Sequence, residues 1–224
     1  MKINGIDYLG IERVLKRGSG EIIEELDDVI LVRDSISGAY FADCEDTKNG
    51  LALLDRYVSE NCNLLMTVNC ELGQAAFKRY GFLGKMECYQ VAYYGEKPAL
   101  NTELRIRTAD ERDLDILRAN YHLISPEELE NVVKRGCIFL GYYQKRLVGF
   151  IGEHLEGSMG LLYVFPEYRR RGFGMALQTY LIAKTLERGL IPFAQVEKDN
   201  VNSLNLQKKL GMEKSDHLIV WMWK

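Results

Sequence analysis

The sequence predicts a mixed α/β fold, in which helices flank a central β-sheet and the chain forms two related halves. Three observations predict it. Short apolar segments with the two-residue period of strands alternate with segments of helical periodicity. In the second half their order is strand, helix, helix, three strands, helix, strand, helix, strand. The end of the first half repeats the end of the second after a shift of 130 residues.

The composition is that of a globular protein with one large or two small domains. The chain has 224 residues, of which 47% are hydrophobic and 27% charged, and its net charge is −3. This charge argues against a surface that coats nucleic acid. No segment has the ~18 apolar residues of a membrane span, and the start of the chain lacks the apolar region of a signal peptide. The five cysteines form no CxxC pair, so we expect free thiols and a cytoplasmic protein.

The boundary between the halves is expected in the short polar segment 95–101, where Pro98 interrupts strand pairing. This predicts a first domain at residues 1–97 and a second at residues 98–224.

Local signals predict each element of the second half in turn. Residues 104–108 alternate as a strand, Asp110 is expected to cap a helix, and Ser125 with Pro126 begins another helix. Strands are expected at 137–143, 147–154 and 158–165, with a turn at Glu156 and Gly157 between the last two. A helix from Gly172 to Arg188 follows, closed by a glycine. The remaining elements are a strand at 191–196, a helix at 200–210 and a strand at 217–223.

The turn before the long helix has the features of an anion site. The first amides of a helix have no intrahelical acceptor, and the helix dipole adds partial positive charge there. Gly172 and Gly174 let an anion approach the backbone, and three consecutive arginines precede them. This predicts a pyrophosphate site, and the alternative is a tight turn with solvated arginines. Neither a GxxxxGK phosphate loop nor a GxGxxG motif is present after this strand.

The motif Arg169-x-x-Gly172-x-Gly174, preceded by Val164-x-Pro166-Glu167-Tyr168, resembles the acyl-CoA signature of the GNAT N-acetyltransferases. Asn200-x-x-Ser203-x-x-Leu206-x-x-x-Leu210-Gly211-Met212 resembles the family's second helix on the CoA side, and the order of elements is also similar. The resemblance covers about residues 104–224. The short C-terminal portion further resembles the branch that contains the glycine N-acyltransferases.

This resemblance implies that the turn amides hold the pyrophosphate of CoA and that the strand around Val164 pairs with its pantetheine arm. It implies acetyl-CoA as the co-substrate. The residues implied in binding are Leu162, Tyr163, Val164, Arg169, Arg170, Arg171, Gly172, Phe173, Gly174, Met175, Asn200 and Ser203.

Two positions depart from the family pattern. Many members have a tyrosine four residues before the Gly-Phe pair that acts as general acid toward the CoA thiolate, and this chain has Gln207 there. Histone-acetylating members and glycine N-acyltransferases have a glutamate base six residues before the position of Val164, and this chain has Ser158. Both departures leave the acid–base mechanism open.

The repeat makes the first half similar to a degenerate GNAT-like domain. Residues 62–95 predict a strand, a helix, a Gly-Phe pair and a strand. In the counterpart of the anion turn, Thr47 replaces the first arginine and three acidic residues precede it, which would repel a pyrophosphate. We therefore expect one CoA per chain, with the first half packing on the second and helping to shape the acceptor site.

A two-residue turn at Glu156 and Gly157 would pair Glu153 with Gly160 and place Glu153 on the face of Ser158. Glu153 would then replace the missing base, directly or through water, and the alternative is a solvated glutamate at a strand end. His154 would point to the opposite face. No cluster with metal-ligand spacing is present, so no metal is expected.

These observations predict an acyl-CoA-dependent N-acyltransferase in which an amine of a small molecule or peptide attacks the thioester directly. One alternative is an acyl-CoA-binding or regulatory protein without catalysis. Another is an aminoacyl transferase that uses charged tRNA, against which the negative net charge argues. We expect neither nucleic acid nor membrane as a partner, and both a monomer and a homodimer remain open.

Overall fold

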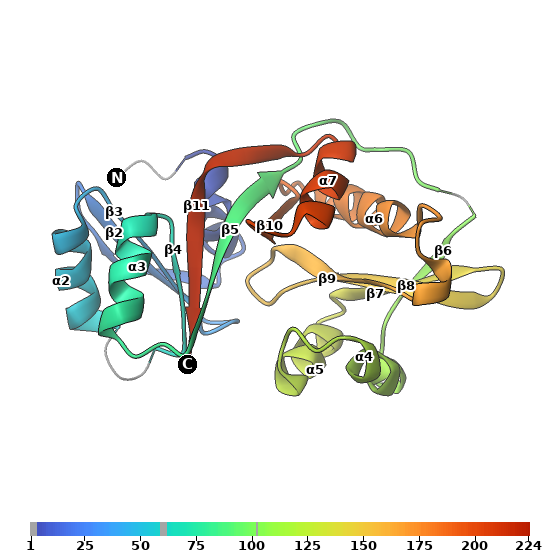
Figure 1. Ribbon diagram of the computed structural model, residues 1–224, viewed down its shortest axis with the longest axis horizontal. Helices are drawn as coiled ribbons and strands as arrows, with labels where there is room; N and C mark the ends of the chain where they lie inside the picture. Colours follow the sequence, from blue (N-terminus) through green and yellow to red (C-terminus); the bar gives the residue numbers. More distant parts are fainter. Residues whose placement is uncertain (1–3, 59–61, 102) are drawn as a thin grey trace. The chain divides into compact units, whose positions relative to one another are not determined.

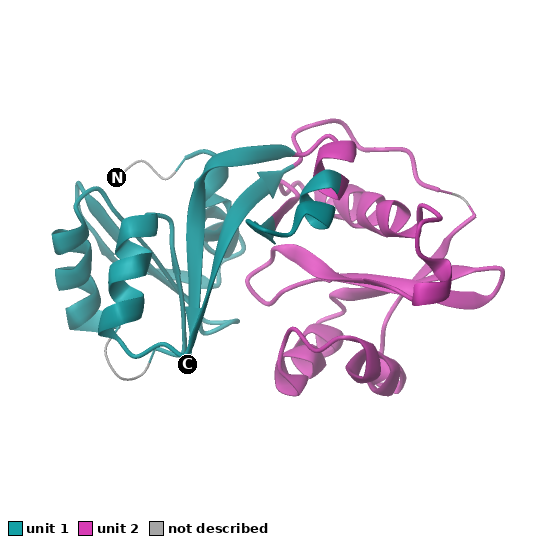
Figure 2. Ribbon diagram, viewed as in Figure 1, with its two compact units in different colours: residues 1–92, 195–205, 213–224 teal, residues 93–194, 206–212 magenta. Residues whose placement is uncertain are grey.

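The computed structural model of the protein describes residues 4–58, 62–101 and 103–224. The chain forms two compact units, shown in teal and magenta in Figure 2. Unit 1 comprises residues 1–92, 195–205 and 213–224, and unit 2 comprises residues 93–194 and 206–212. The predicted boundary after residue 97 lies near the end of the first segment. It did not anticipate that two C-terminal segments pack with the N-terminal part of the chain.

Unit 2 contains an antiparallel sheet with helices on both faces (Figure 1). Its strands run in the order β9, β8, β7, β6, with residues 193 and 194 of β10 beside β9. The elements are β6 (Arg105–Thr108), η2 (Glu111–Asp113), α4 (Leu114–Asn120), α5 (Pro126–Lys134), β7 (Ile138–Tyr143), β8 (Arg146–Glu153), β9 (Met159–Val164), η3 (Pro166–Tyr168), α6 (Phe173–Glu187) and β10 (Phe193–Glu197). Helices α4 and α5 cover one face and α6 the other.

The caps predicted for these helices are present. Asp110 and Asp113 form a capping box at η2, and Ser125 accepts a hydrogen bond from the Glu128 amide at the start of α5. Apolar side chains of α4 and α5 then pack on Phe150 and Leu161 of the sheet. This packing fixes the face of the hairpin β8–β9 that α5 covers.

Unit 1 contains a second sheet, with strands in the order β1, β2, β3, β4, β11, β5. Its elements are η1 (Ile6–Tyr8), α1 (Leu9–Lys16), β1 (Gly20–Glu25), β2 (Val29–Asp34), β3 (Tyr40–Cys44), α2 (Thr47–Tyr57), β4 (Leu64–Thr67), α3 (Cys70–Arg79), β5 (Gly84–Ala92) and β11 (Glu213–Trp223). The last strand, β11, lies between β4 and β5 and is antiparallel to both. The C-terminus of the chain thus completes the sheet of the N-terminal half.

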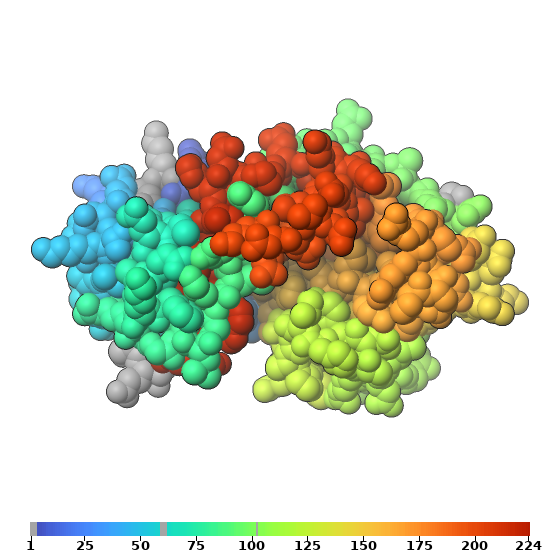
Figure 3. Space-filling view, viewed as in Figure 1, coloured from blue at the N-terminus to red at the C-terminus, as the bar shows by residue number. Residues whose placement is uncertain are grey.

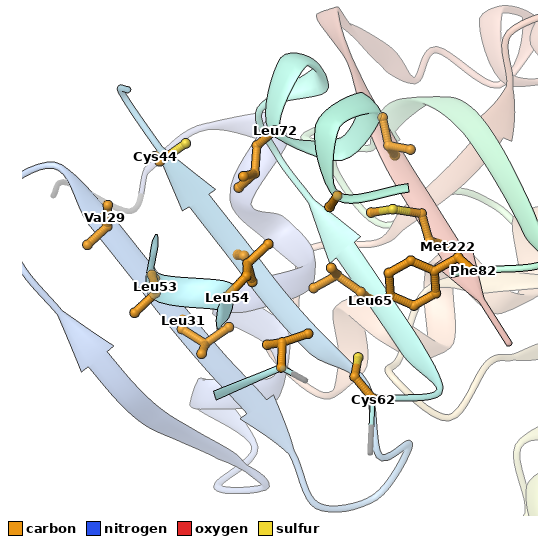
Figure 4. Packing of buried hydrophobic residues seen from close by; sticks show 14 residues of the cluster. Val29, Leu31, Cys44, Leu53, Leu54, Cys62, Leu65, Leu72, Phe82 and Met222 are labelled. Carbon is orange, nitrogen blue, oxygen red and sulfur yellow. The ribbon is translucent and has the colours of Figure 1, made fainter. Parts of the chain in front are cut away.

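The core of unit 1 lies on both faces of this sheet. Leu53 and Leu54 of α2 and Leu72 of α3 pack on Leu31, Leu65 and other sheet residues on one face (Figure 4). On the other face α1 packs on a cluster that includes Phe41 and Trp221, whose rings meet edge to face. Burying these large apolar side chains on both faces is the main stabilising contribution to the unit.

The predicted mixed α/β fold is confirmed, and so is the order of all the elements predicted for the second half. The strand, helix and strand predicted within residues 62–95 correspond to β4, α3 and β5. The segment β3-α2-β4-α3-β5 has the same element order as β9-α6-β10-α7-β11, where α7 is Val201–Lys209. The two halves are therefore related in their order of elements.

Candidate functional site

The turn that connects β9 to α6 places an uncapped helix start at the surface. Gly172 is the N-cap of α6, with φ of 83°. A Cβ at Gly172 would meet no heavy atom within 4 Å, so the backbone conformation, and not a lack of space, calls for glycine. In this fully described segment no side chain caps the helix. Ala176 is the first residue whose amide donates within the helix, to Gly172 O at 3.0 Å, which leaves the amides of residues 173–175 without an intrahelical acceptor.

The three arginines of the turn have different surroundings. Arg169 Nε donates to Val164 O at 2.9 Å, and its guanidinium lies over the ring of Tyr163. The guanidinium of Arg171 lies 5.2–5.7 Å from the ring centroids of Tyr143, Tyr168 and Phe173. These contacts hold the turn in shape. Arg170 is exposed and has a φ of 63°, which is uncommon for a residue other than glycine.

This arrangement suits an anionic group such as a pyrophosphate. The free amides and the dipole of a 15-residue helix both favour negative charge at this end. In the space-filling view the orange segment that contains the turn reaches the surface (Figure 3). Of the predicted CoA-binding residues here, Gly174 and Met175 remain partly accessible, whereas Phe173 is buried and supports the turn.

Strand β9, which leads into the turn, pairs with β10 only at its start. Met159 pairs with Ala194 of β10, and no further β9–β10 pair occurs in the described part of the chain. Leu161 has a φ of 51°, and the β8–β9 register shifts at the same place, which marks a β-bulge. Leu162, Tyr163 and Val164 are partly exposed. An extended ligand with amide groups can pair with such a strand edge.

Asn200 and Ser203 lie at the start of α7. Asn200 Oδ1 accepts a hydrogen bond from the Ser203 amide at 3.1 Å, so Asn200 acts as a helix cap. Both residues belong to unit 1, whereas the turn belongs to unit 2. Their role in CoA binding stays a prediction.

The counterpart of the anion turn in the first half is built differently. Asp46 is the N-cap of α2, and its Oδ1 accepts a hydrogen bond from the Asn49 amide at 3.0 Å. A Cβ at Gly50 would lie 2.6 Å from Cys44 Sγ and 2.9 Å from Leu72 Cδ1. This glycine therefore serves close packing. A carboxylate already occupies the helix start, so this turn is unsuited to an anion.

The hairpin β8–β9 has a register that differs from the predicted one. Glu153 pairs with Met159 instead of Gly160. The turn has three residues and ends at Gly157, whose φ is 98°. The two-residue turn would have required a positive φ at Glu156, which glutamate rarely adopts. The predicted pairing of Glu153 with Gly160 is wrong for this reason.

The corrected register turns Glu153 toward α6. Its carboxylate accepts hydrogen bonds from Arg188 Nη1 at 2.9 Å, from Arg188 Nη2 and from Thr185 Oγ1 at 3.3 Å. The side chain of Glu153 is only 6% exposed. The structure therefore does not bring Glu153 and Ser158 together, and it engages this carboxylate in an ion pair at the end of α6.

His154 lies beside Ser158 instead, which corrects the prediction that it points to the opposite face. The His154 amide donates to Ser158 O at 2.9 Å. A Cβ at Gly160 would lie 2.4 Å from His154 Nε2, so the imidazole covers this glycine. Its Nδ1 lies 3.4 Å from Glu128 Oε1 of α5. Gly157 was the signal that the prediction missed. A glycine at the third position of the turn indicates a three-residue turn, which places His154 opposite Ser158.

Two carboxylates, those of Glu128 and Glu156, lie near this histidine on the face that α5 covers. Burial opposes a positive charge on His154, but the Glu128 carboxylate, aided by Glu156, outweighs it and raises the pKa of the imidazole above its ordinary value. Ser158 is 2% exposed, and its Oγ donates to the Glu156 carboxylate. Burial, with the charge of Glu128, raises the pKa of Tyr121 to about 12, so its hydroxyl stays protonated at neutral pH.

Gln207 occupies the position where the resemblance would place a tyrosine that acts as general acid. Its side chain is buried and exchanges two hydrogen bonds with Gln178 of α6, one at 2.5 Å and one at 3.3 Å. A carboxamide has no acidic proton comparable to that of a phenol. This position therefore offers no general acid.

Residues 138–222 match the family model described as FR47-like protein. No curated protein matches the sequence.

Several solved structures, among them GCN5-related N-acetyltransferases, resemble nearly the whole chain. A Drosophila protein matches with a TM-score of 0.71 at 16% identity, over 99% of this chain and 91% of its own. A GCN5-related N-acetyltransferase-like protein from Streptococcus suis gives 0.57 at 18%, over 96% and 92%. A GCN5-related N-acetyltransferase from Kribbella flavida gives 0.58 at 12%, over 98% and 94%. The chain therefore has the GNAT fold, and its residues 138–222 match the FR47-like family model.

Among the residues that the structure describes, no helix combines the length and the apolar character that crossing a membrane requires. In the same residues no three histidine, cysteine, aspartate or glutamate side chains gather as metal ligands.

Proposed function

We propose that the protein is an acyl-CoA-dependent N-acyltransferase that uses acetyl-CoA and a primary amine. The observation that carries the proposal is the turn from β9 to α6, where an uncapped helix start follows a strand with an open edge. The FR47-like match contains this segment. Acetyl is proposed as the acyl group because structural neighbours are named acetyltransferases.

In this proposal each part of the site has one task. The amides of residues 173–175 and the exposed Arg170 bind the pyrophosphate. The edge of residues 162–164 pairs with the amides of the pantetheine arm. The thioester then lies toward Gly160, four residues or about 13 Å back along the strand from Val164.

The reaction is a direct transfer. The nitrogen of a neutral amine attacks the thioester carbon, the carbon–sulfur bond breaks, and CoA leaves as a thiolate. The proton lost by the amine and the proton gained by the thiolate balance, so the products are an amide and CoA. Gln207 offers no acid for the thiolate, so in this proposal solvent supplies that proton.

Two measurements test the proposal. Calorimetry should show binding of CoA, and thiol release from acetyl-CoA should rise above background with at least one member of a panel of amines, amino acids and peptides. An amide product identified by mass spectrometry must accompany the thiol. Binding of CoA without any amide product would leave the second candidate, an acyl-CoA-binding or regulatory protein, which the closed Gln207–Gln178 pair favours.

A further inference from the structure

The chain contains a histidine–carboxylate pair that the resemblance does not assign. His154 and Glu128 come from different elements, the end of the β8–β9 hairpin and the first turn of α5. The His154 side chain is 26% exposed, so the imidazole is sheltered but open to solvent.

The position of the imidazole relates it to the reacting end of the proposed site. In the antiparallel hairpin, His154 stands opposite Ser158, and Gly160 is the next residue on the same face of β9. The ring reaches across to Gly160, which has no side chain to hold it away. Gly160 immediately precedes the bulge at Leu161, after which the open edge of β9 begins.

From this geometry we infer that His154 accepts the proton of the acceptor amine, with Glu128 as the positioning residue that orients the imidazole. The inference rests on the proposed function. The neutral imidazole takes a proton from the attacking nitrogen as the new carbon–nitrogen bond forms, and the imidazolium returns it to solvent. A Glu128 carboxylate at Nδ1 favours the tautomer with its proton there, which leaves Nε2 over Gly160 as the acceptor.

The charged and titratable groups around His154 agree with this role. Glu128 faces it from α5 and Glu156 from the hairpin turn, and both stabilise the imidazolium. Tyr121, at the end of α4, faces Glu128 and stays protonated. A base whose pKa lies near the working pH is the most effective. The sheet also separates this pair from Glu153, which lies on the opposite face and accepts a hydrogen bond from Arg188.

The test compares full-length variants in steady-state transfer from acetyl-CoA to the best amine of the panel. His154→Gln should lower kcat/KM for the amine by about 10²–10³-fold near neutral pH, with CoA affinity unchanged. The loss should shrink as the pH rises, because more of the amine is then neutral in solution. The exposed His122 provides the matched control, and His122→Gln should keep the wild-type rate.

Two further variants separate the chemical role from a structural one. Glu128→Gln removes the carboxylate that raises the pKa of His154, so the acid limb of the pH profile should move to lower pH. Gly160→Ala keeps the histidine but forces its ring aside, since Nε2 lies 2.4 Å from the new Cβ position, and should reproduce the loss. Circular dichroism melting checks that each variant is folded.

The outcomes separate this inference from the proposed function. If the wild type is active and folded His154→Gln keeps its rate and its pH profile, the inference is wrong and the proposed function stands. If the wild type binds CoA but acylates no amine, the proposed function fails and the inference fails with it.

Discussion

A charge placed at Gly172 tests the anion site directly. The perturbation is Gly172→Asp, and its matched control is Gly172→Asn, which has nearly the same shape without the charge. Both side chains enter open space, since no heavy atom lies within 4 Å of the Cβ position. Both also adopt the left-handed conformation, which Asn and Asp tolerate better than other residues. The two variants therefore share their backbone strain and differ in charge alone.

The expected magnitude follows from Coulomb's law. A carboxylate at residue 172 would lie on the order of 5 Å from a phosphate held by the amides of residues 173–175. One pair of unit charges at that separation repels by about 0.8 kcal/mol in water and about 3 kcal/mol at an effective dielectric constant of ~20. The turn is exposed, so we expect an intermediate value. Gly172→Asp should bind CoA about 10- to 100-fold more weakly than Gly172→Asn.

Calorimetric titration with CoA at two salt concentrations is the assay. Because screening shortens the range of the repulsion, the difference between the variants should narrow at high salt. Equal CoA affinities for the two folded variants at low salt would refute the placement of the pyrophosphate at the start of α6.

Three other predictions address the rest of the chain. Native mass spectrometry should find one CoA per chain, because Asp46 already caps α2, and a second bound CoA would contradict this. Gly50→Ala should lower the free energy of unfolding by about 1–3 kcal/mol without changing CoA affinity, because its Cβ would overlap Cys44; a CoA affinity that falls instead would give this glycine a ligand-binding role. Glu153→Gln should weaken the ion pair with Arg188 and lower stability in urea, and kcat should stay near wild type; a loss of 10²–10⁴ in kcat would restore Glu153 as the base.

The sequence predicted the elements of the second half because their signals are local. Asp110 and Ser125 cap helices where they were expected to, and Gly172 precedes a helix. The signal for the β8–β9 turn is also local, but the predicted turn had two residues where the structure has three. The predicted register therefore placed His154 and Glu153 on the wrong faces of the hairpin. An error of one residue in a register exchanges the two faces of a strand.

Other features depend on contacts that no local pattern contains. The apolar alternation of β11 predicts a strand but does not say that it will lie between β4 and β5, about 120–160 residues earlier in the chain. The arginine run predicted three arginines at the pyrophosphate site but not their surroundings, and Arg169 and Arg171 pack on aromatic rings. Those rings come from β7, β9, the turn and the start of α6, so the packing is visible only once these elements are assembled.

The two halves share a topology but differ at the helix start where an anion would bind. In each half a strand ends in a short turn and a helix begins, β3 to α2 in one and β9 to α6 in the other. At α2 the N-cap is Asp46, whose carboxylate satisfies an amide of the first turn and adds negative charge. At α6 the N-cap is Gly172, which provides no acceptor and leaves the amides open. Because a capping carboxylate and a bound phosphate compete for the same donors, we expect the residue at the N-cap to decide which half can bind CoA.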